Sequence, residues 1–551
     1  MTNKQLTEDE RRRYEVINRE NIDFLMERNN RVNRWVVADM IRRSRDHFPN
    51  KTALIFGDIS LTYTELEDQC NQVANALAGL GVKKYDRVAI LARNTHHHVL
   101  TWLGCAKLGA IYLAVNYLLR DDGIAFCINH SESVVFIIEG SLYSQVKDVM
   151  AKMLSVKHFI WSNQGLGEAP PACADRPHGF MNFDEWFAAA PQTEPDVILR
   201  IEDPVQMTYT SGTESLPKGV IMSNQGLISG YLSIAIGGQY KPSDIQINAL
   251  PIFHSGQRDA FMNPLFWVGG TNILMEPDIG KILVAIEKYR ATMFFAPPTV
   301  WIAILRHPDF GKYNLSSLTK CCYGAAIMPE AILREVMEKF PQAGIFNLYG
   351  QTELFHSMLG SEDAMMKLGS AGTCFVHMEG RIEDLDGQEI SEAGVAGEIC
   401  GRGPHAMTMY FKDPDKTEAA MTGGWFHTGD LGVYDDDRYV TVVDRKKDMI
   451  KTGGENVASR KVEDAIYLHA AVEEVAVVGV DHPRWVEAVV AVVKVKTGFA
   501  ITEDELLAHC RGHLAGFEAP KKIIFVDGLT KTPSGKLLKR VMREQYRGIF
   551  Q

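Results

Sequence analysis

The chain has 551 residues, of which 46% are hydrophobic and 23% are charged, as in ordinary globular proteins. Length alone predicts about three to four domains. The net charge of −11 argues against a nucleic-acid partner, which needs a basic surface, so an anionic substrate has to be attracted by local positive groups. The nine cysteines form no CxxC pair, and we expect reduced, mostly buried thiols in a cytoplasmic protein.

The N-terminal part of the chain is charged and helical in its pattern. Residues 7–47 are rich in Glu and Arg with apolar residues at helical spacing, which predicts a helical extension over residues 1–50. The adjacent residues His96, His97 and His98 cannot share one helix face, so we expect a solvated helix start and no metal site. The apolar stretch 100–119 contains Lys107 and Gly109, which favours a buried helix and strand over a transmembrane segment.

Residues 52–300 alternate short β-rich runs with helical patterns, which predicts α/β layers with much parallel sheet. The expected strands include 87–91 and 133–138, and the expected helices include 63–80 and 97–108. Residues 164–174 are typical of a loop, and the glycine-rich run 380–410 indicates a small barrel-like subdomain. A separate α+β pattern then follows, with helices at 459–469 and 502–513 and strands at 474–480 and 488–496.

The most informative stretch is residues 209–219, Tyr-Thr-Ser-Gly-Thr-Glu-Ser-Leu-Pro-Lys-Gly. Small residues let backbone N–H groups approach an anion, hydroxyls add donors, and Lys218 adds a compact positive charge. The order of residues is not that of a Walker A loop. The stretch therefore predicts a polyphosphate site, although by itself it would also suit a surface turn.

Five further motifs follow in order, and together with residues 209–219 they closely resemble the adenylate-forming superfamily of acyl-CoA synthetases, peptide-synthetase adenylation domains and beetle luciferases. The motifs are Asn347–Glu353, Gly424–Asp430, Asp444–Ile450, Gly453–Asn456 and Thr532–Lys536. The resemblance covers nearly the whole chain. It implies a large N-terminal AMP-binding domain over residues 51–446 and a small, mobile α+β lid over residues 447–551.

The resemblance also implies the reaction. A carboxylate attacks the α-phosphate of ATP to give an acyl-adenylate and pyrophosphate, and a thiol then displaces AMP. Phosphate contacts are implied for Thr210, Ser211, Gly212, Thr213 and Lys218. Glu353, with Thr213, would hold Mg²⁺, because a hard cation prefers oxygen ligands, and Thr352 would reach the α-phosphate.

The remaining nucleotide contacts are assigned through the same resemblance. They are Gly324, Ala325, Ala326, Asn347, Tyr349 and Gly350 around adenine, with Asp430 and Arg445 at the ribose. Lys536 on the lid is the main catalytic candidate, since it would bridge the acid and the α-phosphate in the transition state. Lys447 matches the hinge, and the thiol tunnel is assigned to Lys451, Gly453, Gly454 and Glu455.

The acyl pocket is the least defined part of the site. It is assigned to His254, Arg258, Trp267 and Gly350, with His254 also counted as catalytic because it marks the carboxylate end. Arg258 either pairs with Asp259 on the surface, which we favour, or meets a polar or second carboxyl group of the substrate. Trp267 is a possible apolar wall, with core packing as its default. The acid is expected to be medium- or long-chain, alicyclic or aryl.

The phosphate loop departs from the family pattern at Glu214 and Ser215, where relatives have Thr-Gly. A carboxylate beside a polyphosphate site repels it, so we hypothesise weaker pyrophosphate binding with adenylation retained. The leading interpretation is an AMP-forming acyl-CoA synthetase that uses ATP, CoA and Mg²⁺, and homodimers are common among such enzymes. Alternatives are a ligase that loads a carrier protein and, on Glu214 and Ser215 alone, a nucleotide-binding pseudoenzyme.

Overall fold

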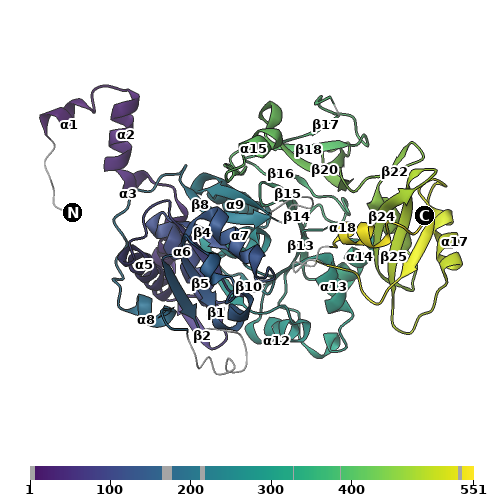
Figure 1. The fold of residues 1–551 in the computed structure, drawn as a ribbon, viewed down its shortest axis with the longest axis horizontal. Helices are drawn as coiled ribbons and strands as arrows, with labels where there is room; N and C mark the ends of the chain where they lie inside the picture. Colours follow the sequence, from purple (N-terminus) through teal and green to yellow (C-terminus); the bar gives the residue numbers. More distant parts are fainter. Residues whose placement is uncertain are drawn as a thin grey trace.

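The computed structural model describes residues 7–163, 177–210, 217–326, 328–384, 386–531 and 537–550. The predicted loop at 164–174 lies outside these residues. Two large sheets and one small sheet make up an N-terminal body, residues 7–445, and a separate sheet with its own helices makes up a C-terminal unit, residues 450–550 (Figure 1). The predicted α/β class with a small C-terminal α+β unit is therefore confirmed.

The first sheet carries the start of the phosphate loop. Its order is β19-β9-β8-β4-β3-β5-β6-β7, parallel from β8 through β7, while β9 runs antiparallel to both β8 and β19. The bounds are β3 Arg87–Leu91, β4 Ile111–Ala114, β5 Ser133–Glu139, β6 His158–Ser162, β7 Met181–Asn182, β8 Pro204–Thr210, β9 Lys218–Ser223 and β19 Met409–Tyr410. The predicted strands at 87–91 and 133–138 are confirmed.

The second sheet carries the Asn347–Glu353 motif. Its order is β16-β15-β14-β13-β12-β10-β11-β1-β2. The six strands from β14 to β1 in this order are parallel, and those at the two ends of the sheet are antiparallel to their neighbours. The bounds are β1 Thr52–Phe56, β2 Ile59–Thr62, β10 Ile245–Asn248, β11 Thr271–Leu274, β12 Met293–Ala296, β13 Lys320–Gly324, β14 Gly344–Gly350, β15 Phe355–Leu359 and β16 Thr373–Cys374. Carboxyl ends of parallel strands meet at one edge, so the ends of β13 and β14 lie side by side.

Helices cover these two sheets, and the predicted helices at 63–80 and 97–108 are α5 (Tyr63–Gly79) and α6 (His96–Leu108). The others are α4 Met40–His47, α7 Asp122–Ser131, α8 Phe183–Ala188, α9 Asn224–Gly237, α10 Ser255–Gln257, α11 Asn263–Val268, α12 Ile279–Tyr289, α13 Pro298–Leu305 and α14 Glu330–Lys339. Helix α6 begins at the histidine run, but all three rings are buried, so the prediction of a solvated start is wrong. The ring of His97 stacks on Phe183 of α8 and lies against Ser162 and Asp184.

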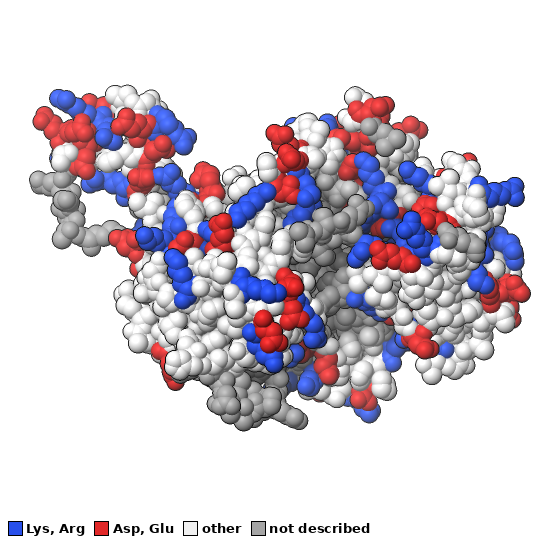
Figure 2. Space-filling view, viewed as in Figure 1, with Lys and Arg blue, Asp and Glu red and all other residues white. Residues whose placement is uncertain are grey.

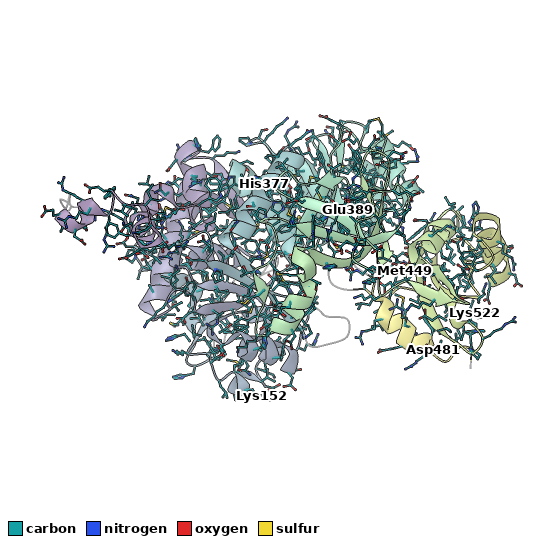
Figure 3. The ribbon with its side chains drawn as sticks, turned by 90° about the horizontal axis from the view of Figure 1, so that it is seen from above. Lys152, His377, Glu389, Met449, Asp481 and Lys522 are labelled. Atoms are coloured by element: carbon teal, nitrogen blue, oxygen red, sulfur yellow. The ribbon has the colours of Figure 1, made fainter. Side chains whose placement is uncertain are left out.

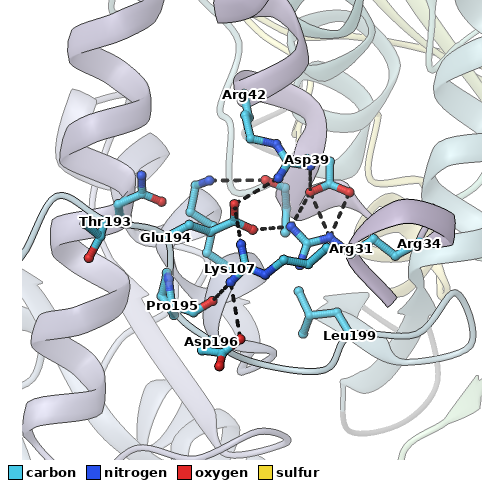
Figure 4. A network of polar contacts seen from close by, with 12 residues as sticks. Arg31, Arg34, Asp39, Arg42, Lys107, Thr193, Glu194, Pro195, Asp196 and Leu199 are labelled. Carbon is cyan, nitrogen blue, oxygen red and sulfur yellow. Dashed lines mark hydrogen bonds and ion pairs between the residues drawn. The ribbon is translucent and has the colours of Figure 1, made fainter. Parts of the chain in front are cut away.

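The N-terminal extension is helical, as predicted. Helices α1 (Glu8–Arg12) and α2 (Arg19–Arg28) project from the body with acidic and basic side chains interleaved, and α3 (Asn30–Asn33) joins them to it (Figures 1 and 2). A charge network fixes the junction: Arg34 bonds both Asp39 and Glu194, and Arg42 bonds the same two carboxylates (Figure 4). Because these side chains are largely buried, the network holds the chain entering α4 against the loop that precedes β8.

A small sheet completes the body and corresponds to the predicted barrel-like subdomain. Its order is β17-β18-β20-β21, all antiparallel. The bounds are β17 Glu379–Glu383, β18 Gly397–Arg402, β20 Phe426–Tyr434 and β21 Val440–Arg445, with α15 Pro414–Ala420 beside β19. Its apolar face is formed by Ile382, Ile399, Tyr434 and Val440.

The C-terminal unit has its own sheet, β23-β22-β25-β24, with β26 parallel to β25. The bounds are β22 Ile450–Thr452, β23 Glu455–Val457, β24 Val472–His482, β25 Val486–Val495, β26 Lys522–Phe525, α16 Ser459–Tyr467, α17 Glu503–His513 and α18 Lys539–Tyr546. Met449 lies at the junction with the body, whereas Asp481 and Lys522 lie away from it (Figure 3). In the part of the chain that the structure describes, no helix is long and apolar enough to span a bilayer. A cytoplasmic location stays a prediction.

Candidate active site

The phosphate loop connects two hydrogen-bonded strands. Thr210 ends β8, Lys218 begins β9, and the two residues pair directly across the antiparallel ladder. The pairing fixes both ends of the loop at one place on the sheet edge. Ser211, Gly212 and Thr213, like Glu214 and Ser215, lie outside the described residues.

Strand β14 carries the second motif to the edge of its sheet. Gly350 ends the strand, and a side chain there would meet the carbonyl of Leu354 at 2.8 Å, so the turn toward β15 requires glycine. Thr352 and Glu353 follow in this turn, and both are buried. Asn347 donates to the carbonyl of Ser370 at 2.7 Å and thereby ties β14 to the neighbouring loop.

Thr352 meets the segment that was assigned to the acyl pocket. Its Oγ1 lies 3.0 Å from Oγ of Ser255, the residue after His254. His254 caps α10, and its Nδ1 accepts from the backbone N–H of Gly256 at 3.1 Å. Thr352, which is predicted to reach the α-phosphate, therefore lies beside the segment that is predicted to hold the carboxylate of the acid.

Glu353 is held by a tyrosine from the first sheet. Tyr410 Oη donates to Glu353 Oε1 at 3.0 Å, and the Nζ of Lys218 lies 4.0 Å from the centre of the same tyrosine ring. Burial and the neighbouring carboxylate raise the pKa of Tyr410, which keeps its hydroxyl protonated as the donor. One carboxylate oxygen is therefore oriented by the protein, and the arrangement brings the predicted metal ligand and the predicted phosphate lysine to a single ring.

The predicted ribose carboxylate also has fixed partners. Asp430 Oδ2 accepts from Tyr349 Oη at 2.9 Å and from Gln351 Nε2 at 3.0 Å, and its Oδ1 lies 3.3 Å from Nε of Arg445. Burial and Asp430 raise the pKa of Tyr349, so the phenol stays protonated. Strand pairing between Asp430 and Arg445 places the motifs of β20 and β21 together.

The Gly324–Ala326 segment follows β13 beside this site. A side chain at Gly324 would meet the carbonyl of Leu348 at 2.5 Å, so β13 and β14 can approach only with glycine there. Ala325 has φ of +63°, and Ala325 and Ala326 are exposed. A strained, solvent-facing turn at a strand end suits a backbone that lies along a ligand.

Arg258 is not on the surface, and the favoured prediction of a surface pair is wrong. Its side chain is 1% exposed and bonds the buried carboxylate of Asp259 at 2.8 Å. The guanidinium also donates to Gln206 Oε1 at 2.9 Å and to the carbonyl of Ile252. Because Asp259 neutralises it, Arg258 works as a link between the helix and the first sheet.

Trp267 packs against the N-terminal segment, in agreement with packing as its default, and its assignment to the acyl pocket stays a prediction. α10, the π-helical turn η4 (Arg258–Met262) and α11 form a continuous helical run, so Trp267 lies about 20 Å along the run from His254. Its ring packs edge-on against Trp35 at a centroid distance of 5.5 Å, and Arg43 lies beside both rings. Trp267 therefore anchors the N-terminal segment.

The predicted hinge and tunnel residues lie at the start of the C-terminal unit. Lys447, in the short link between β21 and β22, is exposed, as are Lys451 and Glu455. Gly453 and Gly454 form a two-residue hairpin between β22 and β23, and both have positive φ, +62° and +92°. Such a turn favours glycine at both positions. Lys536 lies outside the described residues.

Three residues with direct contacts to the predicted site were missed by sequence reasoning: Ser255, Gln351 and Tyr410. Gln351 lies within a recognised motif, and its amide beside a ribose-binding carboxylate was a usable signal. Ser255 follows His254 and also lies in a recognised segment. Tyr410 carries no local signal, since only the pairing of β19 with β9 brings it to Lys218.

Comparison with known proteins agrees with this geometry. A family model described as an AMP-binding enzyme matches residues 41–411, and one described as the AMP-binding enzyme C-terminal domain matches residues 461–536. A feruloyl-CoA synthase from Amycolatopsis sp is 32% identical, covering 94% of this chain and 100% of the relative. A putative acyl-CoA synthetase, YngI, from Bacillus subtilis (strain 168) is 30% identical, covering 92% and 96%.

A solved structure is similar over the same range. The anthranilate CoA ligase AuaEII, in complex with anthranoyl-AMP, has a TM-score of 0.86 and 25% identity, with 94% of this chain and 98% of that chain covered. The fold and site define an adenylate-forming enzyme. The chain belongs to the AMP-binding enzyme family and is an acyl- or aryl-CoA ligase that uses ATP and CoA.

Proposed function

We propose that this ligase activates an aromatic or alicyclic acid with a single carboxyl group and converts it to the CoA thioester. The observation that carries the proposal is the buried Arg258–Asp259 pair, because it removes the cation that could have met a second substrate carboxylate. The aromatic contact between Phe253 and Tyr117, at 5.0 Å next to His254, supports an apolar ring as the substrate. Two of the similar proteins carry names of ligases for aromatic acids.

For the first half-reaction, Glu353 is proposed to hold Mg²⁺ together with Thr213. A buried carboxylate with one oxygen fixed by Tyr410 fits a hard cation that prefers oxygen ligands. When bound, the ion would neutralise charge on the phosphates. The residues Thr210, Ser211, Gly212 and Lys218 are proposed to bind the β- and γ-phosphates, and Thr352 to bind the α-phosphate beside His254. Lys536 is proposed to stabilise the charge that develops as the acid attacks.

The adenosine is proposed to lie along Gly324–Ala326, Asn347, Tyr349 and Gly350, with its ribose on Asp430 and Arg445. Tyr349 and Gln351 already donate to Asp430, so its carboxylate needs no reorganisation to accept ribose hydroxyls. For the second half-reaction, rotation about Lys447 is proposed to bring Lys451, Gly453, Gly454 and Glu455 to the adenylate, where they line the path of the thiol. This motion, the domain boundary at 446 and 447, and a homodimer stay predictions.

The test assays a panel of acids with ATP, Mg²⁺ and CoA, and it measures the release of AMP and pyrophosphate. The highest kcat/KM is expected with cinnamate-like, benzoate-like and cyclohexane carboxylates. Dicarboxylates such as malonate and succinate should have a kcat/KM at least about 100-fold lower, because their second carboxylate would be buried without a cation. Highest activity with a dicarboxylate would contradict the proposal. Replacement of CoA by a carrier protein should abolish product release, and turnover with the carrier alone would favour carrier loading.

A further inference from the structure

A second cluster of ligand-type side chains lies on the small sheet, apart from the predicted Mg²⁺ ligand. Glu383 on β17 pairs with Glu398 on β18, and Cys400 on β18 pairs with His427 on β20. Residues opposite each other, and residues two apart on one strand, share a sheet face. All four side chains therefore lie on one face, opposite to the apolar face that contains Ile399.

The donor atoms in this cluster have the spacing of a metal site. His427 Nδ1 lies 3.5 Å from Cys400 Sγ and 3.5 Å from Glu398 Oε2. Atoms of Glu383, Cys400 and His427 all lie within 4.8 Å of one another. Tetrahedral zinc, with bonds of about 2.0–2.3 Å, sets its donors about 3.3–3.8 Å apart, so the two 3.5 Å distances at His427 Nδ1 already match, whereas the other donors would have to move closer together.

One hydrogen bond of His427 fits this histidine to a metal site. Its Nε2 lies 3.2 Å from the carbonyl of Thr422 and 4.0 Å from Glu383 Oε2, so a proton on Nε2 would leave Nδ1, beside Cys400 and Glu398, to bind a cation. A second hydrogen bond of this kind is the usual support of a metal-bound histidine.

Two carboxylates that face each other across a ladder repel, and among the described residues two side-chain cations and one backbone N–H compensate them. Arg381 bonds Oε1 of Glu383, while Lys446 bonds Oε2 of Glu398 at 3.1 Å. The other oxygen of Glu398 accepts from the backbone N–H of Gly429 at 3.0 Å. A bound metal would compete with Lys446 for Glu398, directly before the predicted hinge.

We propose that Glu383, Glu398, Cys400 and His427 form a binding site for a zinc-type divalent transition metal. Binding releases the Cys400 proton to solvent, and the thiolate, the imidazole and the two carboxylates then bond the ion. Sulfur and imidazole ligands favour Zn²⁺ or Co²⁺ over Mg²⁺, so the site is distinct in chemistry from the one that Glu353 would form. The proposal does not depend on which acid the ligase uses.

Co²⁺ titration of the full-length, chelator-treated protein tests the proposal. We expect a thiolate-to-cobalt absorption band and tetrahedral visible bands that saturate at one ion per chain, that Zn²⁺ removes and that excess Mg²⁺ leaves unchanged. Cys400→Ser should abolish the thiolate band, and His427→Gln should weaken Co²⁺ binding by about 10–100-fold. Cys374→Ser is the matched control, because Cys374 also lies beside a histidine, with its Sγ 3.6 Å from His356 Nε2, and it should keep the band.

The wild-type spectrum tests the proposal whether or not the variants fold. Thermal melts identify any variant that fails to fold. Absence of a thiolate–cobalt band in folded wild-type protein would overturn the proposal. So would persistence of the band in folded Cys400→Ser, or its loss in folded Cys374→Ser.

Discussion

The body and the C-terminal unit contribute to the predicted site in opposite ways. In the body, Glu353 and Asp430 are buried and each accepts a hydrogen bond from a tyrosine. In the C-terminal unit and the link before it, Lys447, Lys451 and Glu455 are exposed, and the glycine hairpin is defined by its backbone conformation. The predicted nucleotide side is therefore preorganised, whereas the predicted residues of the link and the unit would act through where the unit is placed.

The contacts between the two parts fit this contrast. Ser459 of α16 donates through its backbone N–H and its hydroxyl to Asp444 Oδ2, at 2.6 and 2.7 Å. This contact between the two parts is polar, in contrast to the apolar core that each part keeps to itself among the described residues.

Removing the lysine of the C-terminal unit should give the largest effect. Lys536→Ala should lower acyl-adenylate formation by about 10²–10³-fold, because a charge that stabilises the transition state is lost. Acid-dependent pyrophosphate release measures this step. Thioester formation from synthetic acyl-adenylate and CoA should change less than about threefold. If Lys536→Ala lowered the rates of adenylation and thioester formation equally, the proposed difference in role between the body and the C-terminal unit would be contradicted.

Removing the hydrogen bond that Tyr410 donates to Glu353 in the body should give the next largest effect. Tyr410→Phe keeps the ring beneath Lys218 and removes only the donor to Glu353, so the apparent affinity for Mg²⁺ in adenylation should fall by about 10–100-fold. Mg²⁺ saturation curves at fixed ATP measure the shift. Tyr240→Phe, which removes a buried hydroxyl bonded to the carbonyl of Ala260, should leave the curve in place. An unshifted Mg²⁺ saturation curve in Tyr410→Phe would contradict the proposal that Glu353 binds the cation.

The hairpin of the C-terminal unit provides a smaller test. Gly454→Ala strains a residue with φ of +92° by about 1–2 kcal/mol, which should slow thioester formation by about tenfold with adenylation unchanged. Gly498→Ala is the control, because its φ of +86° gives the same strain in the same unit without a predicted role, and neither added methyl group meets an atom within 4 Å. A similar slowing in both variants would assign the effect to general destabilisation.

The smallest expected effect concerns the unusual phosphate loop. Replacing Glu214 by Thr and Ser215 by Gly should tighten pyrophosphate binding by about 1 kcal/mol, or about fivefold, since a negative charge near the phosphates is removed. Product inhibition by pyrophosphate measures the change. Inhibition constants that do not differ from those of the wild type would reject the hypothesis.

Much of the fold follows from local patterns: β3, β5, α5 and α6 appear where their residues predict them. Motifs that lie at strand ends were likewise readable, because β14 and β20 carry their own turn residues. The surroundings of Arg258 and Trp267 could not be predicted in this way. Arg258 bonds Gln206 on β8, and Trp267 packs on Trp35 of the N-terminal segment, contacts that no local pattern specifies.

The buried histidines illustrate the same limit. A run of three polar rings at a helix start is typical of solvent exposure, but the packing of α6 against Phe183 and Ser162 makes it part of the core. Tyr410 differs again, since its two partners, Lys218 on β9 and Glu353 after β14, are distant from it in the sequence.

A crossed comparison of Lys536→Ala and Gly454→Ala tests the division between body and C-terminal unit most directly. Each variant is assayed for pyrophosphate release with acid and ATP, and for thioester formation from the same synthetic acyl-adenylate and CoA. We predict opposite results: Lys536→Ala loses adenylation and keeps thioester formation, and Gly454→Ala keeps adenylation and slows thioester formation. Loss of the same half-reaction in both variants would contradict the account.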